Sequence, residues 1–280
     1  MKKIIFTLAL AFVSVTVATA QKEVKYAKMY YKNIEKQVGD ITITVDNAVS
    51  TDGETKFKLK VTNKTADFII LKPEECKFMI NGQELTPKEK WLIIKPNESD
   101  FKIINMKGTG YNAIKTYSFV VGGLYKTSPK GTVLPAENFR LPAAKNEIKV
   151  NDFTCNLTDL NKQTDKTEAK FKCVYNGSLV GFIDPTKTSV KMPDGNEYAN
   201  AKTTSGLLKS AVGPVMFMKG SEETISMGWD RMQGGKAMDM QKVAMDIIWH
   251  DAFTEAPLVK LENQTLVLEF DETTSNAKGK

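Results

Sequence analysis

Residues 40–45 read Asp-Ile-Thr-Ile-Thr-Val and residues 152–157 read Asp-Phe-Thr-Cys-Asn-Leu, so the chain carries one strand pattern twice. The two stretches lie 112 residues apart (40 to 152), and later landmarks recur at nearly the same spacing. A period of this size is too long for a solenoid repeat and suits one whole domain. We therefore expect a tandem duplication. The later matched landmarks are Pro73 with Pro185, Gly82 with Gly195, and Glu84 with Glu197.

Both copies alternate apolar and polar residues with a period of two, which is the signature of a strand with one buried face. Residues 57–61 read Phe-Lys-Leu-Lys-Val, and residues 171–175 read Phe-Lys-Cys-Val-Tyr. Turn signals such as Asn81-Gly82 separate the short strands. About seven strands per copy, at intervals near ten residues, are typical of a sandwich. The sequence predicts an all-β fold of two tandem immunoglobulin-like antiparallel β-sandwich domains.

The domain limits follow from the extent of each copy. We expect the first domain over residues 22–143 and the second over residues 146–272. The segment 141–146, Leu-Pro-Ala-Ala-Lys-Asn, is short and rich in proline and alanine, so it is predicted to be a stiff junction. Residues 273–280 are polar, and we expect them to form a flexible tail.

The N-terminus has the three parts of a bacterial export signal. Lys2 and Lys3 are charged, residues 4–17 are apolar, and Ala18-Thr19-Ala20 has the small residues that signal peptidase requires. We therefore expect residues 1–20 to be a signal peptide. No cysteine directly follows the apolar run, so a lipoprotein anchor is not predicted. The mature chain is expected to be periplasmic or extracellular and to have no transmembrane span.

The charge balance argues against nucleic acid as a partner. The formal net charge is +6, and the expected signal peptide holds two of the lysines. Only Arg140 and Arg231 are arginines, whereas phosphate sites favour the forked guanidinium group. The lysines are expected to cover solvated strand faces and protect sheet edges.

Two of the three cysteines are predicted to face each other across a hairpin. The midpoint between Cys155 and Cys173 is Thr164, which lies in a polar turn. Antiparallel neighbours lie within disulfide range, and an exported protein meets an oxidising environment. The pair is therefore a disulfide candidate. In the alternative interpretation it is a buried apolar pair, since we match it to Ile43 and Leu59 of the first copy.

Four turn and strand motifs give the first copy a resemblance to a known type of domain. They are residues 39–43 (Gly-Asp-Ile-Thr-Ile), 58–65 (Lys-Leu-Lys-Val-Thr-Asn-Lys-Thr), 79–85 (Met-Ile-Asn-Gly-Gln-Glu-Leu) and 95–99 (Lys-Pro-Asn-Glu-Ser). This pattern resembles bacterial extracytoplasmic immunoglobulin-like domains of unknown function, and the second copy shares it more weakly. The resemblance implies a non-catalytic module and no particular ligand.

The sequence offers little material for catalysis. His250 is the only histidine, which excludes metal sites that need a histidine pair. Asp251 adjoins it, but neighbouring strand residues point to opposite faces, so the two cannot orient one another as a catalytic triad requires. The chain has no nucleophile elbow, P-loop or dinucleotide fingerprint. We therefore predict that the protein is not an enzyme and uses no cofactor.

Methionine is concentrated in residues 216–245. Two Met-x-Met pairs there place both thioethers on one strand face, a spacing that soft Cu(I) can use. In the alternative interpretation these methionines fill gaps in a core. The candidate metal ligands are Met216, Met218, Met238 and Met240.

Tyrosines in loops and in the N-terminal segment are candidates for stacking on a ligand. The leading interpretation is an exported, non-catalytic binding or structural module of the cell envelope, with an envelope protein or a glycan as partner. The first alternative is a carbohydrate-binding or adhesin-like surface protein, and the second is a periplasmic copper-binding protein. The candidate ligand-binding residues are Tyr30, Tyr31, Tyr125 and Tyr198.

Overall fold

The computed structural model describes residues 25–202, 204–205, 210–211, 213–230 and 239–279. Nearly all the regular structure in them is antiparallel β-strand, and one short α-helix, α1 (Glu272–Lys278), follows the last strand. The expected all-β fold is therefore confirmed. No helix within the described residues is long and apolar enough to cross a membrane. The expected signal peptide, residues 1–20, lies outside the described residues.

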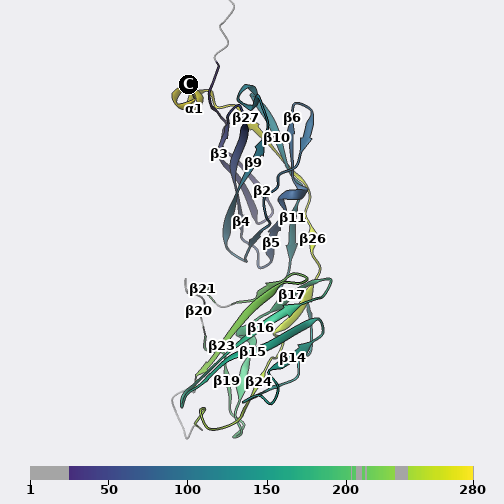
Figure 1. Ribbon diagram of the computed structural model, residues 1–280, viewed down its shortest axis with the longest axis vertical. Coiled ribbons are helices and arrows are strands. Elements are labelled where there is room, and N and C mark those ends of the chain that lie inside the picture. The colour runs from purple at the N-terminus through teal and green to yellow at the C-terminus, as the bar shows by residue number, and fades with distance from the viewer. Residues whose placement is uncertain (1–24, 203, 206–209, 212, 231–238, 280) are drawn as a thin grey trace, which may run out of the picture.

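The strands form two bodies arranged along the long axis of the molecule (Figure 1). The first body consists of residues 25–127 and 257–279, and it contains three sheets. The strands of the first sheet are, in spatial order, β1 (Met29–Tyr30), β3 (Ile41–Ser50), β4 (Glu54–Asn63) and β9 (Ser99–Lys107), and β2 (Ile34–Val38) also pairs with β3. The second sheet has the order β27 (Gln264–Glu269), β10 (Thr116–Val121), β6 (Lys77–Ile80) and β7 (Gln83–Leu85). The third has the order β26 (Val259–Lys260), β11 (Leu124–Thr127), β5 (Phe68–Leu71) and β8 (Leu92–Ile94).

The second body, residues 128–256, repeats the strand order of these three sheets, except that its counterpart of the five-stranded sheet has four strands in the described residues. A separate two-stranded ladder of β20 (Thr204–Ser205) and β21 (Ser210–Ala211) is added to it. The first of the three sheets has the spatial order β14 (Glu147–Val150), β15 (Phe153–Lys162), β16 (Lys166–Tyr175) and β23 (Glu222–Asp230). The second has the order β13 (Phe139–Leu141), β24 (Met245–Ile248), β18 (Ser189–Lys191) and β19 (Glu197–Ala199). The third has the order β12 (Thr132–Val133), β25 (Phe253–Ala256), β17 (Val180–Ile183) and β22 (Val215–Phe217).

Each body has its own hydrophobic core, built from the inward side chains of alternating strands. Phe57, Phe78 and Phe119 pack edge to face or tilted at the centre of the first core, with ring centroids 4.9–5.6 Å apart. Trp249 packs against Phe171 at the centre of the second core, at 5.4 Å. Aromatic pairs of this geometry add to the stabilisation that burial alone provides.

The hairpin of the second body contains a disulfide between Cys155 and Cys173, whose Cα atoms lie 4.0 Å apart. The two residues are direct cross-strand neighbours in β15 and β16. At the equivalent place in the first body, Ile43 faces Val61. The expected match of this position to Leu59 was therefore wrong by two residues, because Leu59 lies on the same face but is paired with Val45.

The last two strands of each copy are exchanged between the bodies. After β11 the chain leaves the first body, and β12 and β13 pair with β25 and β24 of the second. After β25 the chain returns, and β26 and β27 pair with β11 and β10 of the first. The expected limits, 22–143 and 146–272, therefore assign both terminal strand pairs to the wrong body.

The apolar pattern of the sequence does not reveal the exchange, because the pair β12 and β13 and the pair β26 and β27 fill equivalent places in the two bodies. Phe139 and Leu141 of β13 are buried in the second core, and Leu266 and Leu268 of β27 are buried in the first. Both pairs have the same period-two spacing, so local sequence does not tell which core receives them.

The two crossing segments run side by side as an antiparallel ribbon, and Figure 1 shows β26 beside β11 where the chain re-enters the first body. Tyr125 pairs with Lys260 on one side of the crossing, and Thr132 pairs with Glu255 on the other. Gly131 makes this close approach feasible, because a Cβ atom there would lie 2.0 Å from the carbonyl oxygen of Glu255. The bodies are thus joined by two strands.

Two further expectations are corrected. Segment 141–146 was expected to join the domains, but it lies inside the second body, between β13 and β14.

Residues 273–280 were expected to be a flexible tail, but residues 272–278 form α1. Asp271 caps this helix by accepting a hydrogen bond from Thr274 N, and the buried Ser275 accepts one from Tyr30 N at 2.9 Å. Capping and burial of Ser275 therefore hold a polar segment in place.

The exchange predicts which fragment folds alone. Residues 128–256 contain every strand of the second body, so this fragment is expected to unfold in one cooperative transition. The fragment 146–256 lacks β12 and β13 and should be less stable by about 3–6 kcal/mol, since it loses the burial of Phe139 and Leu141. Urea unfolding followed by tryptophan fluorescence measures both. Equal stability of the two fragments would contradict the exchange.

The disulfide predicts a redox-dependent stability. Wild type is expected to exceed the variant Cys155→Ile/Cys173→Val by about 3 kcal/mol in unfolding free energy, because the bridge restricts the unfolded chain. The variant carries the pair that the first body has at this place, Ile43 and Val61, and so keeps an apolar contact. Reductant should remove the difference between the two proteins. A wild-type stability that does not respond to reductant would refute this prediction.

Candidate functional site

The two neighbouring tyrosines of the N-terminal segment have different environments. Tyr31 is buried, and its hydroxyl donates to the carbonyl oxygen of Ile114 at 2.7 Å and contacts Ser50 Oγ at 2.9 Å. Burial raises the pKa of Tyr31, although the hydrogen bond with Ser50 opposes this effect. Tyr31 is therefore part of the core. Tyr30 is half-buried at the surface.

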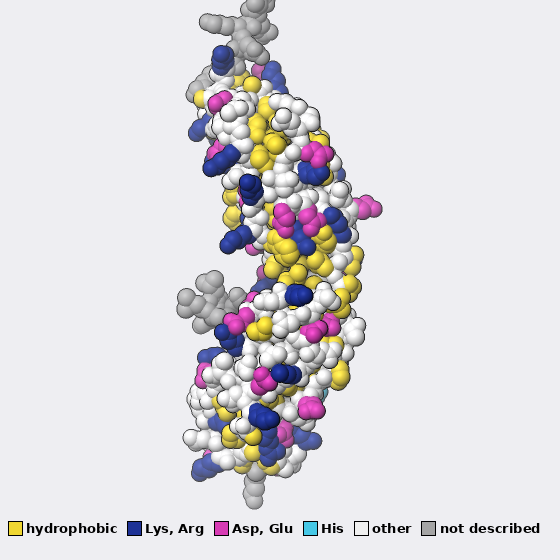
Figure 2. Space-filling view, turned by 45° about the vertical axis from the view of Figure 1, so that its right-hand side comes forward, with side chains coloured by type: hydrophobic (Ala, Val, Ile, Leu, Met, Phe, Trp, Pro, Cys, Tyr) yellow, Lys and Arg dark blue, Asp and Glu magenta, His cyan; other side chains and the backbone are white. Residues whose placement is uncertain are grey.

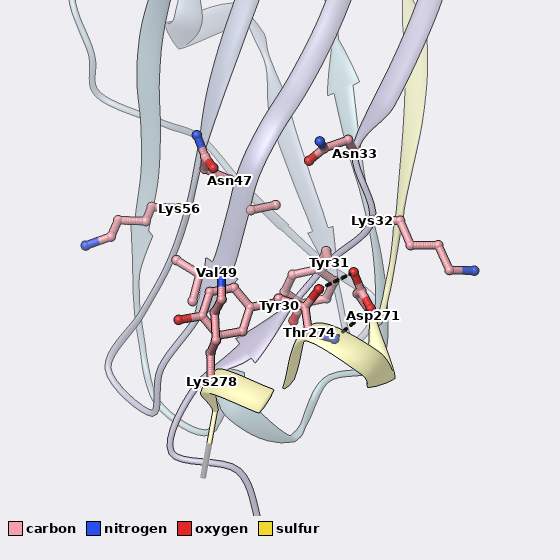
Figure 3. A pocket seen from close by; sticks show the side chains of 11 residues that line it. Tyr30, Tyr31, Lys32, Asn33, Asn47, Val49, Lys56, Asp271, Thr274 and Lys278 are labelled. Atoms are coloured by element: carbon pink, nitrogen blue, oxygen red, sulfur yellow. Dashed lines mark hydrogen bonds between the residues drawn. The ribbon is translucent and has the colours of Figure 1, made fainter. Parts of the chain in front are cut away.

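Tyr30 lines a hollow of about 580 Å³ beside α1 (Figure 3). Lys32 and Lys56 extend to opposite sides in this view, and they form ion pairs with Glu269 at 3.0 Å and Glu54 at 2.6 Å. The hollow is rich in polar groups that suit a hydroxylated ligand. Its other lining residues are Tyr31, Asn33, Asn47, Ala48, Val49, Asp271, Thr274 and Lys278.

Tyr125 belongs to a charged aromatic cluster that attaches β26 to the first body. Its hydroxyl donates to Glu75 Oε2 at 2.6 Å, and Lys260 of β26 donates to the same oxygen at 2.9 Å. Lys72 lies between two rings, with its Nζ 4.5 Å from the centroid of Tyr125 and 4.4 Å from that of Trp91. Such cation–π contacts stabilise a lysine at a partly exposed surface. The polar groups satisfy one another, so the cluster acts as a clamp on the exchanged strand.

The protonation states of this clamp are coupled. Burial alone would raise the pKa of Glu75, but hydrogen bonds from Tyr125 and Lys260 and the positive charges of Lys260 and Lys72 outweigh burial and lower it. The hydrogen bond to Glu75 is the main reason why the pKa of Tyr125 is raised. Glu75 is therefore ionised at neutral pH, which keeps the clamp closed.

The remaining sequence candidates do not join a common site. Tyr198 is half-buried against the second core, opposite Val190. Met216 and Met218 pack at the junction of the bodies, whereas Met240 is buried in the second core. Met238 lies outside the described residues. The three described methionines thus lie in two separate apolar clusters and do not converge.

The single histidine makes a contact that sequence analysis missed. Ser189 Oγ lies 2.9 Å from His250 Nε2, and Glu197 Oε1 lies 2.8 Å from the same nitrogen. A serine–histidine–acid relay needs the acid on the other ring nitrogen, so this cluster lacks the geometry of a catalytic triad. The hydrogen bonds from Ser189 and His250 instead lower the pKa of Glu197. The neighbouring Asp251 takes no part in this cluster.

The strongest candidate site is a cleft of about 450 Å³ where the two bodies meet, which we call the junction cleft. Figure 2 shows apolar side chains exposed around this waist of the molecule. The first body supplies the β8–β9 turn, and the second supplies the edge of β22 and β23. The apolar lining residues are Phe68, Ile93, Pro96, Pro185, Pro214, Val215, Met216 and Ile225, and the polar ones are Lys95, Glu98, Glu223, Thr224 and Ser226, with Gly213.

The floor of the junction cleft is an apolar contact between the bodies. The rings of Phe68 and Phe182 lie 5.4 Å apart, and Val180 and Ala256 are buried beside them. Met216 lies half-buried on this floor. Methionine adapts its shape to different apolar ligands, so this surface suits an apolar side chain. The pair of crossing strands holds the two walls of the cleft in a fixed position relative to each other.

An open backbone edge faces the same cleft. The hydrogen bond from Tyr175 N to Ser221 O fixes the register of β16 and β23, so Thr224 and Ser226 point their N–H and C=O groups away from β16. Both residues line the cleft, and β23 is the outer strand of its sheet in the described part of the chain. The arrangement offers apolar contacts together with backbone donors and acceptors.

Sequence analysis missed the junction cleft because its walls come from strands that were expected to belong to separate tandem domains. One local signal was present in residues 91–94, Trp-Leu-Ile-Ile, where both strand faces are apolar. Leu92 and Ile94 are buried, which leaves Trp91 and Ile93 exposed at 39% and 44%. A strand with two apolar faces is typical of a second contact surface.

Comparisons with known proteins do not identify the chain. No protein-family model and no curated protein matches it. A conserved protein of unknown function from Pseudomonas aeruginosa PAO1 has 9% identity, covers 88% of this chain and 98% of its own length, and gives a TM-score of 0.11. AerE from Microcystis aeruginosa has 10% identity, covers 85% of this chain and 100% of its own length, and gives a TM-score of 0.13. These TM-scores are too low to carry an argument.

The clamp predicts an acid-sensitive part of the stability. The lowered pKa of Glu75 means that its contribution is fully present above its ordinary value of 4.5 and is lost as the pH falls through the folded-state pKa. Glu75→Gln should cost about 1 kcal/mol at neutral pH, and this cost should shrink in acid. Chemical unfolding at a series of pH values measures it. Glu84→Gln, in the exposed pair with Lys77, is the control and should cost less. A cost independent of pH would contradict this role of Glu75.

Proposed function

We propose that this chain is an exported, non-catalytic binding module of the bacterial cell envelope that holds an extended segment of an envelope protein in the junction cleft. The expected signal peptide supports the compartment, and the disulfide fits an oxidising one. The tandem strand pattern supports descent of both bodies from one immunoglobulin-like sandwich. Sandwich domains of this kind bind mainly through sheet edges and end loops.

One observation carries the proposal: apolar side chains and an open sheet edge face the same cleft. Met216 comes from one wall and Ile93 from the other. An extended peptide can add its backbone to the edge at Thr224 and Ser226 and place alternate side chains on the apolar surface. Backbone pairing gives such a ligand its affinity, and the apolar contacts select its side chains.

Site-specific photo-crosslinking in the producing cell tests this function. A photoreactive amino acid at Ile93 is expected to give a discrete crosslinked protein adduct, because this side chain is exposed at the cleft. The same amino acid at Val267, which is similarly exposed on β27 and outside the cleft, is the control and should give none. Adducts of equal yield at both positions, or none at Ile93, would overturn the proposal.

A glycan partner is the second candidate, and the hollow beside Tyr30 favours it. A half-buried ring next to Asn33 and Asn47 provides a stacking face and amide groups for hydroxyl recognition. Titration with envelope glycans separates the two candidates. Binding lost in Tyr30→Ala and kept in Ile93→Thr would favour the glycan function over the peptide function.

A further inference from the structure

Each body takes two of its strands from the other tandem copy. We call residues 25–144 the first repeat and residues 145–279 the second repeat. The first repeat supplies β12 and β13 to the second body, and the second repeat supplies β26 and β27 to the first body. The exchange is therefore reciprocal, as it is when two identical subunits swap a segment.

The two crossings match residue for residue. Where the second repeat enters the first body, Lys126 of β11 faces Val259 of β26. Where the first repeat enters the second body, Glu255 of β25 faces Thr132 of β12. Glu255 thus holds the position of Lys126 in the repeat. Val259 likewise holds the position of Thr132.

Backbone hydrogen bonds just beyond the crossings follow the same relation. In the first body Leu261 N donates to the carbonyl oxygen of Leu124 at 2.8 Å. In the second body Leu134 N donates to the carbonyl oxygen of Phe253 at 2.9 Å. Each of these contacts has a counterpart in which the repeats change roles. An approximate two-fold axis therefore relates the repeats at the crossing, as in a symmetric dimer.

The side chains that face the other body are apolar in both repeats. Phe68 and Ile70 of β5 alternate with residues of the first core, so they share the face that contacts the second body. Their counterparts in β17 are Val180 and Phe182, and all four are buried. Phe68 packs on Phe182, which holds the position of Ile70. Two identical repeats would therefore bring together Phe68 with Ile70, or Val180 with Phe182.

The second repeat is built against closing on itself. If β26 paired with β25 as it pairs with β11, Glu255 would face Val259 across a loop of residues 256–258, Ala-Pro-Leu. Hairpin loops of three residues place the third residue in the left-handed conformation, which is strained for leucine, and the residue before it is a poor place for proline. The last two strands of this repeat are therefore directed to another repeat.

From these relations we propose that the exchange surface of each repeat fits a second copy of the same repeat, so that the chain is a strand-exchanged homodimer with covalently joined subunits. A repeat that is freed from its neighbour forms a symmetric dimer, donates its last two strands and receives the same two in return. Residues 142–146 act only as the covalent link. This choice of partner is independent of any ligand in the junction cleft.

Cutting the full mature chain once between the repeats tests the proposal. A protease site inserted after Ala144, which is exposed, keeps both repeats present and leaves the disulfide intact. Before unfolding, native mass spectrometry is expected to find one particle that contains one copy of each repeat. After unfolding in urea and refolding, it is expected to find two further particles, a dimer of first repeats and a dimer of second repeats.

Paired cysteines report whether the refolded dimers exchange strands. In the uncut variant Lys126→Cys/Thr132→Cys the two cysteines face Val259 and Glu255, so they are not strand neighbours. In an exchanged dimer of first repeats they face each other across the two subunits, within disulfide range. This dimer is therefore expected to stay linked on a denaturing gel without reductant.

A substitution at the apolar face measures its share in the association. Phe182→Ser should lower the population of second-repeat dimers about tenfold or more, because each subunit loses a buried ring. Val267→Thr, at an exposed valine on β27, is the control and should leave this population unchanged.

Four results would overturn the proposal. They are refolding only to the particle with one copy of each repeat, refolding to single repeats, a disulfide within one repeat in place of one between two, and aggregation of the cut protein under conditions in which the uncut chain refolds. Dimers whose cysteines stay unlinked would also contradict it, because they would associate without exchanging strands.

Discussion

The antiparallel ribbon that crosses between the bodies is the constraint on which the rest of the structure depends. A single linker lets two domains swing, whereas paired crossing strands resist bending in the plane of the ribbon. The apolar contact of Phe68 with Phe182 then joins the two bodies where they meet. The junction cleft needs this rigidity, since each body supplies only one of its walls. The clamp of Glu75 and Lys260 strengthens the same crossing from the side of the first body.

Sequence reasoning reached the parts of the fold that depend on local pattern. Period-two alternation identified the all-β class, and the placement of Cys155 opposite Cys173 followed from hairpin symmetry. It could not predict the strand exchange, because Leu266 and Phe139 are apolar side chains that fill equivalent places in two similar cores. Only the strand pairing, a non-local property, separates the exchanged arrangement from a simple tandem one.

The sites were harder to predict than the fold, for a physical reason. A tyrosine in a loop-like segment has the same local sequence whether its ring is buried in the core, as in Tyr31, or half-buried at the surface, as in Tyr30. The junction cleft was missed for a related reason, since each body supplies only one of its walls. Local sequence does not record which strands of the two bodies will face each other.

The interleaved path of the chain also changes what a backbone cut would do. Lys130 is exposed in the crossing segment, so trypsin can reach it. Cleavage there would leave the C-terminal piece embedded in its partner through Leu266 and Leu268, which are fully buried. The two pieces would remain a native complex until those leucines were extracted. The molecule therefore contains a natural split point, at which one covalent chain becomes a complementing pair.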